Sequence, residues 1–261
     1  MDRSNIVKIA HTPEDRVLLA KIWDKIQTGI RKNIPAATCF LSPRELEMAR
    51  YLFGELPGLV RFGGYESAER KMLIYLPDYL DDDYLWSDDA PIACLHTTYY
   101  EADILSHRNF LGALMGSGIA REVVGDICVG KGSTDFFVTD EIAPYILQNF
   151  QSAGRTKLHI TRIPLSQANI PQPEIAEIKD TLASLRLDSM ISAGFRINRT
   201  LAAEHISSGR AAINGLICEK PDKAIAEGAK ISVRGLGKIK LAKVNGQTKK
   251  GRISVVIHRY I

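Results

Sequence analysis

Residues Gly125 to Ser133, GDICVGKGS, come within one position of a phosphate-binding loop. Such a loop needs a Ser or Thr directly after its Lys, because that hydroxyl binds the magnesium ion of a nucleoside triphosphate. Gly132 occupies this position after Lys131. A phosphate-binding loop also leads from a strand into a helix, whereas the residues that follow, GSTDFFVTD, alternate and are rich in strand formers. The pattern predicts a β-hairpin turn at 130–133 and no bound nucleotide.

Four arginines near the C-terminus form a second group with a chemical use. The guanidinium group is planar and pairs with a phosphate through two parallel hydrogen bonds. Each of the four lies near the end of a short predicted helix or strand, where its side chain can project from a compact platform: Arg186, Arg196, Arg199 and Arg210. We therefore expect a phosphate-rich partner at this part of the chain.

The charge of the chain is divided in the same way. Residues 186–261 contain fifteen Lys and Arg against five Asp and Glu, a net charge of +10, whereas the whole chain carries +4. The preceding residues therefore carry a net charge of −6. A basic module behind an acidic body favours a polyanion-binding unit attached to another domain.

Other groupings do not predict a metal site or a catalytic centre. The acidic loop at 78–89 has neither the glycine turn nor the final bidentate Glu of a calcium loop, so we expect it to be solvated. His96, His107 and His159 are not spaced as metal ligands on one helix. The four cysteines form no CxxC pair. We expect buried, reduced thiols, no metal and no cofactor.

The composition is that of a globular protein with two or three domains: 261 residues, 45% hydrophobic and 25% charged. The sequence has no apolar run of about 18 residues. Its first residues, MDRSNIVKIAHTPEDR, lack the apolar centre of a signal peptide. We expect a cytoplasmic protein that does not bind membranes.

Residues 1–58 predict an N-terminal helical region. One helix starts with Thr12 as N-cap and Pro13 at its first position, and places an apolar face on residues 17–30. A second helix starts at LSPRELEMARYLF, where Ser42 and Glu45 have the spacing of a capping box. Both starts carry strong local signals, so these helices are expected irrespective of the rest of the fold.

Residues 59–165 predict an α+β domain of the ferredoxin-like (RRM-like) kind. The stretches RKMLIYLP and IACLHTTY predict strands, and SHRNFLGALMGSG predicts a helix. The hairpin around Lys131, the helix EIAPYILQNF and the strand KLHITRI complete the order strand, helix, strand, strand, helix, strand. That architecture often binds RNA, although a fold alone does not establish a function.

The last two predicted parts are a linker with a short helix at 166–183, where prolines interrupt the chain, and a separate domain at 184–261. The domain begins with an apolar helical face on Leu187, Met190 and Ile191, followed by a second helix in RTLAAEHISSG. AAINGLICEK then predicts two short strands joined by an Asn-Gly turn.

These last segments resemble the S4 domain, a small RNA-binding module. The stretches RLDSMI and NRTLAAEHISSGRAAINGLICEKPDKAIAEGAKISVRG carry its Arg-Leu-Asp, its polar-Arg pair, its Gly-Arg and its Asn-Gly turn over about fifty residues. The chain departs from the pattern at Asn198, where Ser is usual, and at Gly228-Ala229, where Gly-Asp is usual. The resemblance implies RNA contacts at six residues: Arg186, Arg196, Arg199, Arg210, Asn214 and Lys220.

The chain as a whole resembles the bacterial YlmH family of S4-domain RNA-binding proteins, which is also associated with cell division. An S4-like C-terminus follows a predicted ferredoxin-like domain that contains SHRNFLGALMGSGIAREVVGDI. The resemblance implies binding to ribosomal RNA and tRNA on large ribosomal subunits blocked by peptidyl-tRNA, in ribosome-associated quality control. Other quality-control factors are further candidate partners. A second RNA contact is expected in the middle domain, at His107, Arg108 and Lys131.

The sequence favours a non-catalytic protein. A pseudouridine synthase would have a second Arg-Leu-Asp outside the S4 unit, and the sequence has RLD only at 186–188. The glycine-rich loop of a methyltransferase and the paired nucleotide-binding signatures of an aminoacyl-tRNA synthetase are missing as well. Two alternatives remain open: an RNA-modifying enzyme with an unrecognised active site, and a division factor that binds only proteins.

Overall fold

The computed structural model describes residues 3–248 and 251–261, and the chain divides into two compact units, Met1–Pro171 and Gln172–Ile261. Both units mix helices and strands, so the predicted α+β class is confirmed. No helix within the described residues combines the length and the apolar character that a membrane span needs.

The N-terminal unit opens with helices that start where the sequence predicts. Thr12 and Ser42 are N-caps with complete capping boxes, and each is followed by a proline. The buried face of the long helix is shifted from the expected one, because Val17 is exposed and Leu19 is buried. The elements of this part are η1 (Arg3–Asn5), α1 (Ile6–Ile9), α2 (Pro13–Lys32), β1 (Ala36–Ala37) and α3 (Pro43–Phe53).

One of the two strands expected near the start of the ferredoxin-like domain, RKMLIYLP, belongs instead to a small separate sheet, whereas IACLHTTY forms β4 of the larger sheet. Strands β2 (Leu59–Phe62) and β3 (Met72–Tyr75) form a three-stranded antiparallel sheet with β1, in the order β1-β3-β2. Local patterning identifies a strand but not its partner, because pairing depends on residues far away in the chain. The acidic loop after β3 contains the short helix η2 (Asp82–Trp86), which is capped by Asp81.

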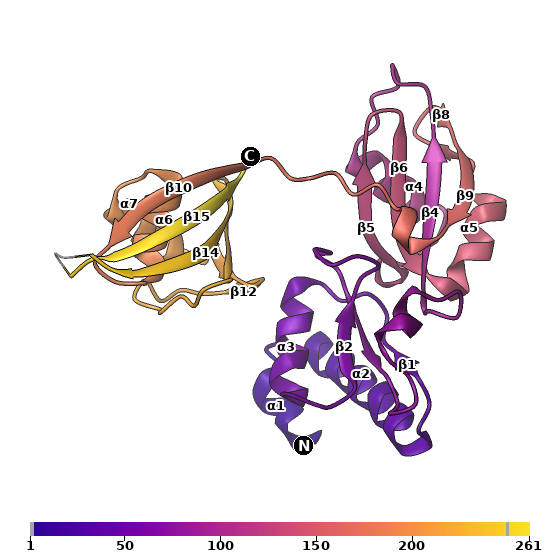
Figure 1. Cartoon of the computed structure of the whole chain (residues 1–261), viewed down its shortest axis with the longest axis horizontal. Coiled ribbons are helices and arrows are strands. Elements are labelled where there is room, and N and C mark those ends of the chain that lie inside the picture. Colours follow the sequence, from indigo (N-terminus) through magenta and orange to yellow (C-terminus); the bar gives the residue numbers. More distant parts are fainter. Residues whose placement is uncertain (1–2, 249–250) are drawn as a thin grey trace. The chain divides into compact units, whose positions relative to one another are not determined.

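The larger sheet of this unit has four antiparallel strands in the order β5-β6-β4-β9 (Figure 1). The predicted hairpin is confirmed, because β5 pairs directly with β6 on either side of Lys131. The elements in chain order are β4 (Ile92–Thr98), α4 (His107–Gly116), η3 (Arg121–Val123), β5 (Val124–Val129), β6 (Ser133–Thr139), η4 (Asp140–Ile142), α5 (Ala143–Asn149), β7 (Ser152–Ala153), β8 (Thr156–Lys157), β9 (His159–Ile163) and η5 (Leu165–Gln167).

The two faces of the four-stranded sheet have different covers. On one face, Leu95 and Phe136 pack in a core with Phe110 of α4 and Ile146 of α5. On the other face, Cys94 and Phe137 pack with residues of the N-terminal segments, among them Phe40, Met72 and Ile74. Hydrogen bonds also join these N-terminal segments to the sheet. Asp126 of β5 accepts one from the Tyr65 hydroxyl at 2.8 Å and one from the Glu69 amide at 2.6 Å. The N-terminal region and the sheet therefore form one unit.

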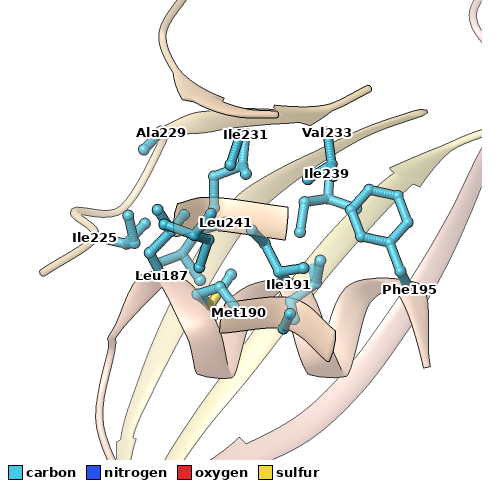
Figure 2. Close-up of a cluster of buried hydrophobic side chains, with 14 of the residues drawn as sticks. Leu187, Met190, Ile191, Phe195, Ile225, Ala229, Ile231, Val233, Ile239 and Leu241 are labelled. Carbon is cyan, nitrogen blue, oxygen red and sulfur yellow. The ribbon is translucent and has the colours of Figure 1, made fainter. Parts of the chain in front are cut away.

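The C-terminal unit is a six-stranded antiparallel sheet with two helices, in the strand order β10-β15-β14-β13-β11-β12 (Figure 1). The core between helices and sheet contains Leu187, Met190 and Ile191 from the first helix, all fully buried as predicted (Figure 2). The elements are β10 (Ile175–Leu182), α6 (Leu187–Phe195), α7 (Arg199–Ser207), β11 (Ala211–Ile213), β12 (Leu216–Ile217), β13 (Lys230–Val233), β14 (Gly237–Gln247) and β15 (Ile253–Tyr260).

The prediction of a short helix within residues 166–183 is wrong. Residues Ile175–Leu182 form β10, which pairs with β15 from Ile175 opposite Tyr260 to Leu182 opposite Ile253. The segment AEIKD is compatible with either structure by local preference, and the long partner strand from the other end of the unit decides the outcome. The strand is therefore part of the C-terminal unit.

Candidate nucleic-acid interface

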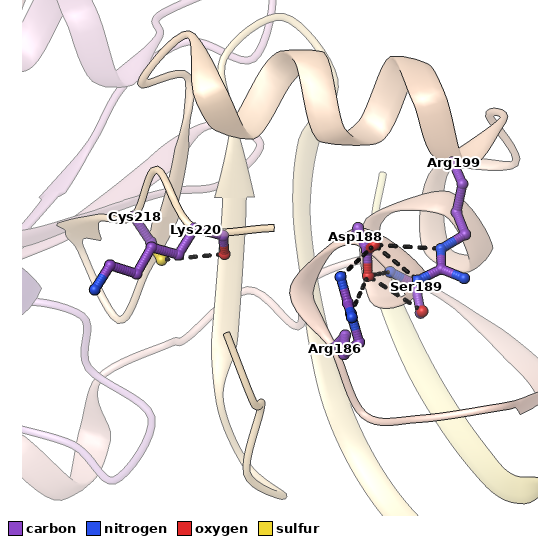
Figure 3. A network of polar contacts seen from close by, with 6 residues as sticks. All are labelled: Arg186, Asp188, Ser189, Arg199, Cys218 and Lys220. Carbon is purple, nitrogen blue, oxygen red and sulfur yellow. Dashed lines mark hydrogen bonds and ion pairs between the residues drawn. The ribbon is translucent and has the colours of Figure 1, made fainter. Parts of the chain in front are cut away.

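The centre of the candidate interface is the buried carboxylate of Asp188, in the first turn of α6, whose side chain is 8% exposed. Arg199 donates to it from Nη2 at 2.8 Å and from Nε at 3.3 Å. Arg186 donates from Nε and Nη2, both at 3.3 Å (Figure 3). The backbone amide of Ser189 adds a bond of 2.7 Å. One carboxylate thus orients two guanidinium groups. We name these residues, Arg186, Asp188, Ser189 and Arg199, the Asp188 cluster.

The electrostatics of the cluster favour a charged aspartate. Burial raises the pKa of Asp188, but hydrogen bonds from Arg199 and from the Ser189 amide outweigh this effect, so the pKa lies below its usual value. At neutral pH the two arginines therefore share a single negative charge. Their side chains are 42% and 54% exposed. The cluster keeps an excess positive charge at the surface, in a fixed orientation that suits phosphate.

Local structure places the two arginines around the carboxylate. Arg186 is the N-cap residue of α6, and the loop before β13 holds it through a bridge to Ala224. Arg199 is the first residue of α7, where the Asn198 side chain accepts a hydrogen bond from the Leu201 amide at 2.7 Å. Asn198 thus supplies the cap that Ser would supply. The sequence predicted both arginines but not that Asp188 joins them.

The other residues of this unit that were predicted to contact RNA lie outside the Asp188 cluster. Arg196, Arg210 and Lys220 are exposed. Asn214 occupies the turn between β11 and β12 with φ of 49°, and its side chain accepts a hydrogen bond from the Lys230 amide at 3.0 Å. Because this bond stabilises the turn, the presence of Asn214 can be explained without any contact to RNA.

The predicted second contact lies at one end of the four-stranded sheet. Lys131 is exposed in the turn from β5 to β6, beside the end of β4, since the Tyr99 amide donates to the Gly132 carbonyl at 2.9 Å. His107 and Arg108 are exposed in the first turn of α4, whose N-cap is Ser106. The Ser106 capping box extends to Asn109 and does not use His107 or Arg108. His107 and Arg108 therefore have no part in that cap.

Much of the sheet surface cannot bind bases. Ferredoxin-like RNA-binding domains of the RRM type stack bases on aromatic side chains of the sheet, but here Phe137 and Cys94 are buried beneath the N-terminal segments. The uncovered half of the same face carries His96, Thr98 and His159, of which the last two are exposed. Bases can therefore stack on this face of the sheet only at the uncovered half.

A close pair between His96 and Asp135 was not expected from the sequence pattern. Nδ1 of His96 lies 2.5 Å from Oδ1 of Asp135, whose other oxygen accepts a hydrogen bond from the Asn169 amide at 2.5 Å. The pair arises because His96 of β4 lies opposite Asp135 of β6 in the sheet. A carboxylate that orients a histidine can support acid-base chemistry. The same arrangement also serves as a purely structural link between strands.

The remaining titratable groups are dispersed. Within the described residues, no group of three or more His, Cys, Asp or Glu side chains is arranged to hold a metal ion. The four cysteines are free thiols, but the expectation that all are buried is wrong, because Cys39 is exposed and Cys94 alone is fully buried. The exposure of a cysteine depends on its position in the fold. It cannot be predicted from the types of its neighbours in the sequence.

Comparison with known proteins identifies the family. A family model described as "Putative RNA-binding domain in YlmH" matches residues 89–167. The chain is 32% identical over 224 residues to the "Ribosome-associated protein quality control protein P2" of Bacillus subtilis, and the match covers 85% of this chain and 86% of that protein. The chain belongs to the YlmH family. The family predicted from the sequence is confirmed.

A solved structure shares the fold. The protein described as "Cell division protein ylmH from Streptococcus pneumoniae" superimposes with a TM-score of 0.50, over 62% of this chain and 98% of that chain, at 20% identity. The family model that matches residues 89–167 of this chain covers the four-stranded sheet, together with His107, Arg108 and Lys131. The Asp188 cluster lies outside that match, in the C-terminal unit.

Proposed function

We propose that this YlmH-family chain is a non-catalytic, cytoplasmic RNA-binding protein that acts on large ribosomal subunits carrying stalled peptidyl-tRNA, in ribosome-associated quality control. The observation that carries the proposal is the Asp188 cluster, in which two half-exposed arginines are held by one buried carboxylate. The part of the chain that begins with this cluster has a net charge of +10. Fixed guanidinium groups in a positive field suit the phosphates of structured RNA.

The comparisons and the topology support the proposal. The Bacillus subtilis relative is named as a ribosome-associated quality control protein, and the family model names an RNA-binding domain. The proposal includes a ferredoxin-like assignment for β4 to β9, supported by the strand order β5-β6-β4-β9. It also includes an S4 assignment for α6 to β13, supported by the helix pair and the hairpin that follows it.

Two linked RNA contacts fit the two units. The Asp188 cluster would bind backbone phosphates of the RNA. The end of the four-stranded sheet, with His107, Arg108 and Lys131, would add a second contact to ribosomal RNA or tRNA. Two linked sites bind more tightly than either alone, since the second binding step is intramolecular. Arg108→Ala with Lys131→Ala should therefore weaken ribosome binding while the C-terminal unit still binds RNA.

Co-sedimentation with large ribosomal subunits over a salt series tests the function. We expect the parent chain to bind subunits that carry peptidyl-tRNA more tightly than empty subunits, and to dissociate as salt rises. Arg199→Glu should release the protein at physiological salt, because a repulsive charge replaces an attractive one. Equal binding of parent and Arg199→Glu would contradict the role of the cluster.

Crosslinking to RNA in cell extract identifies the partner. Enrichment of one ribosomal RNA helix together with tRNA supports quality control, whereas recovery of proteins without RNA would favour the division-factor alternative. The enzymatic alternative has a specific test at the His96–Asp135 pair. His96→Gln should leave the modification pattern and the integrity of bound RNA unchanged, and a lost modification would show an enzyme.

A further inference from the structure

A cavity of about 370 Å³ lies in the C-terminal unit, beside the Asp188 cluster. Three arginines line it: Arg196, Arg199 and Arg252. Its volume is near the lower end of the range of small-ligand pockets. Arg199 belongs to both the cavity and the cluster, so the cavity continues the surface on which the proposed function rests.

Arg252 lies just before β15, outside the stretch that resembles an S4 domain. Its Nε donates to the Thr181 hydroxyl at 3.0 Å, and its Nη2 donates to the Thr181 carbonyl. These bonds use two of the five N–H donors of a guanidinium group. Strand β10 therefore fixes the Arg252 side chain at the cavity while further donors can reach an anion.

Arg196 enters the cavity from the end of α6, in an unusual backbone conformation. Its φ of 55° and ψ of 43° are left-handed, a conformation that glycine adopts far more readily than arginine at the end of a helix. An arginine at a position where glycine is favoured is a reason to look for a use of its side chain. Arg196 is one of the residues that line the cavity.

The cavity has an excess of positive charge. Asp180 is the one carboxylate among its described lining residues, and it is exposed, with its Oδ1 accepting a hydrogen bond from the Thr181 amide at 2.6 Å. Three guanidinium groups and one exposed carboxylate thus line the cavity, and one of these arginines, Arg199, is also paired with Asp188. Hydroxyl groups complete a polar lining, among them Ser192, which donates to the Ile197 carbonyl at 2.7 Å and can still accept.

We propose that this cavity binds one backbone phosphate of an RNA strand, in addition to the phosphates bound at the Asp188 cluster, and that Arg252 is its key ligand. The proposal deepens the proposed function and rests on it. The phosphate would pair with Arg252 and Arg196, while Arg199 joins the two phosphate sites. Asp180 would oppose binding, because its charge repels the phosphate.

Co-sedimentation of the full chain with large ribosomal subunits over a salt series tests the cavity. Arg252→Ala should weaken binding about tenfold and reduce the slope of log affinity against log salt by about one. Lys243→Ala is the matched control, since it removes one exposed positive charge from β14 without touching the cavity. Asp180→Asn should strengthen binding, because it removes repulsion and keeps the size of the side chain.

The outcomes separate this proposal from the proposed function. If the parent chain does not bind ribosomal subunits, both fail. If the parent binds but Arg252→Ala behaves like Lys243→Ala and Asp180→Asn has no effect, the cavity proposal alone is overturned. Should Arg252→Ala lower the melting temperature, Asp180→Asn still decides, because that change breaks no arginine bond.

A second measurement distinguishes RNA phosphate from free phosphate ion. Arginine side-chain NMR signals of the full chain are followed during titration with inorganic phosphate at constant ionic strength. Shifts at Arg252 together with an unchanged ribosome slope in Arg252→Ala would show a site for free anions and overturn the proposal. A reduced slope in Arg252→Ala, with or without shifts by phosphate, supports the RNA phosphate site.

Discussion

Each unit of the molecule contains a buried aspartate paired with arginine, and the two pairs serve different ends. In the N-terminal unit, Asp15 accepts two bonds from Arg44 at 2.8 Å and 2.6 Å, and also caps α2 through the His11 and Thr12 amides. In the C-terminal unit, Asp188 divides its bonds between Arg186 and Arg199 at 2.8 to 3.3 Å. The first carboxylate is matched by one arginine, and the second is shared by two.

The two pairs differ in how much of the arginine side chain stays exposed and unpaired with its aspartate. Arg44 is 35% exposed and is held by both its Nη atoms, so its short bonds serve mainly to join α3 to the start of α2. Arg199 is 54% exposed and shares its carboxylate, so positive charge remains at the surface. The one-to-one pair leaves little free arginine, whereas the shared carboxylate leaves positive charge at the surface.

The largest expected effect comes from removing both arginines of the shared pair. Arg186→Ala with Arg199→Ala leaves Asp188 buried without its cationic partners, which should lower the free energy of unfolding by about 3 kcal/mol and abolish ribosome binding. Urea unfolding and co-sedimentation measure the two effects. Adding Asp188→Asn should restore much of the stability but none of the binding. Recovery of binding in that triple variant would contradict a direct role for the arginines.

The one-to-one pair should affect stability alone. Arg44→Ala should lower the free energy of unfolding by about 2 kcal/mol, since Asp15 keeps its amide bonds but loses its charge partner. Ribosome affinity and its salt slope should stay at the parent values. The control is Arg50→Ala, which removes an exposed arginine paired with Glu47 on α3. A changed salt slope in Arg44→Ala would show that this region also meets RNA.

Acid should weaken the pair in the N-terminal unit over a defined range. Hydrogen bonds from Arg44 lower the pKa of Asp15 to about 2, although burial raises it, from a usual value of 3.8. Because the folded pKa is depressed, the stabilisation is present above pH 3.8 and is lost as pH falls towards 2. The loss should be about 2 kcal/mol, seen as a difference between parent and Asp15→Asn in urea unfolding from pH 6 to 2.5. Parallel curves for the two proteins would contradict this.

The smallest expected effect separates binding from stability in the shared pair. Arg199→Ala should weaken ribosome binding about tenfold and reduce the salt slope by about one. Arg186 still holds Asp188, so the free energy of unfolding should fall by less than about 1 kcal/mol. Co-sedimentation over a salt series and thermal melts of the same preparation give both values. A collapsed melting transition would make Arg199 a structural residue like Arg44.

Local signals predicted much of the fold and part of the candidate site. Thr12 and Ser42 cap their helices as expected, because a capping box needs only residues three positions apart. Asn214 and Gly215 form the predicted hairpin turn with positive φ at both residues. The helix predicted within 166–183 is a strand, because its partner β15 lies about 80 residues away and no local pattern reports it.

The sequence by itself determined the helix starts, the hairpins, the basic charge of the C-terminal part, the family and the identity of the arginines at the candidate site. Tertiary structure decided which residues hold those arginines in place. It joined Arg186 and Arg199 through Asp188, brought Arg252 to Arg196 by pairing β10 with β15, and buried Phe137 under the N-terminal segments. Capping, turn preference and charge depend on residues close together in the chain. Strand pairing and burial depend on distant residues that meet only when the whole unit is folded.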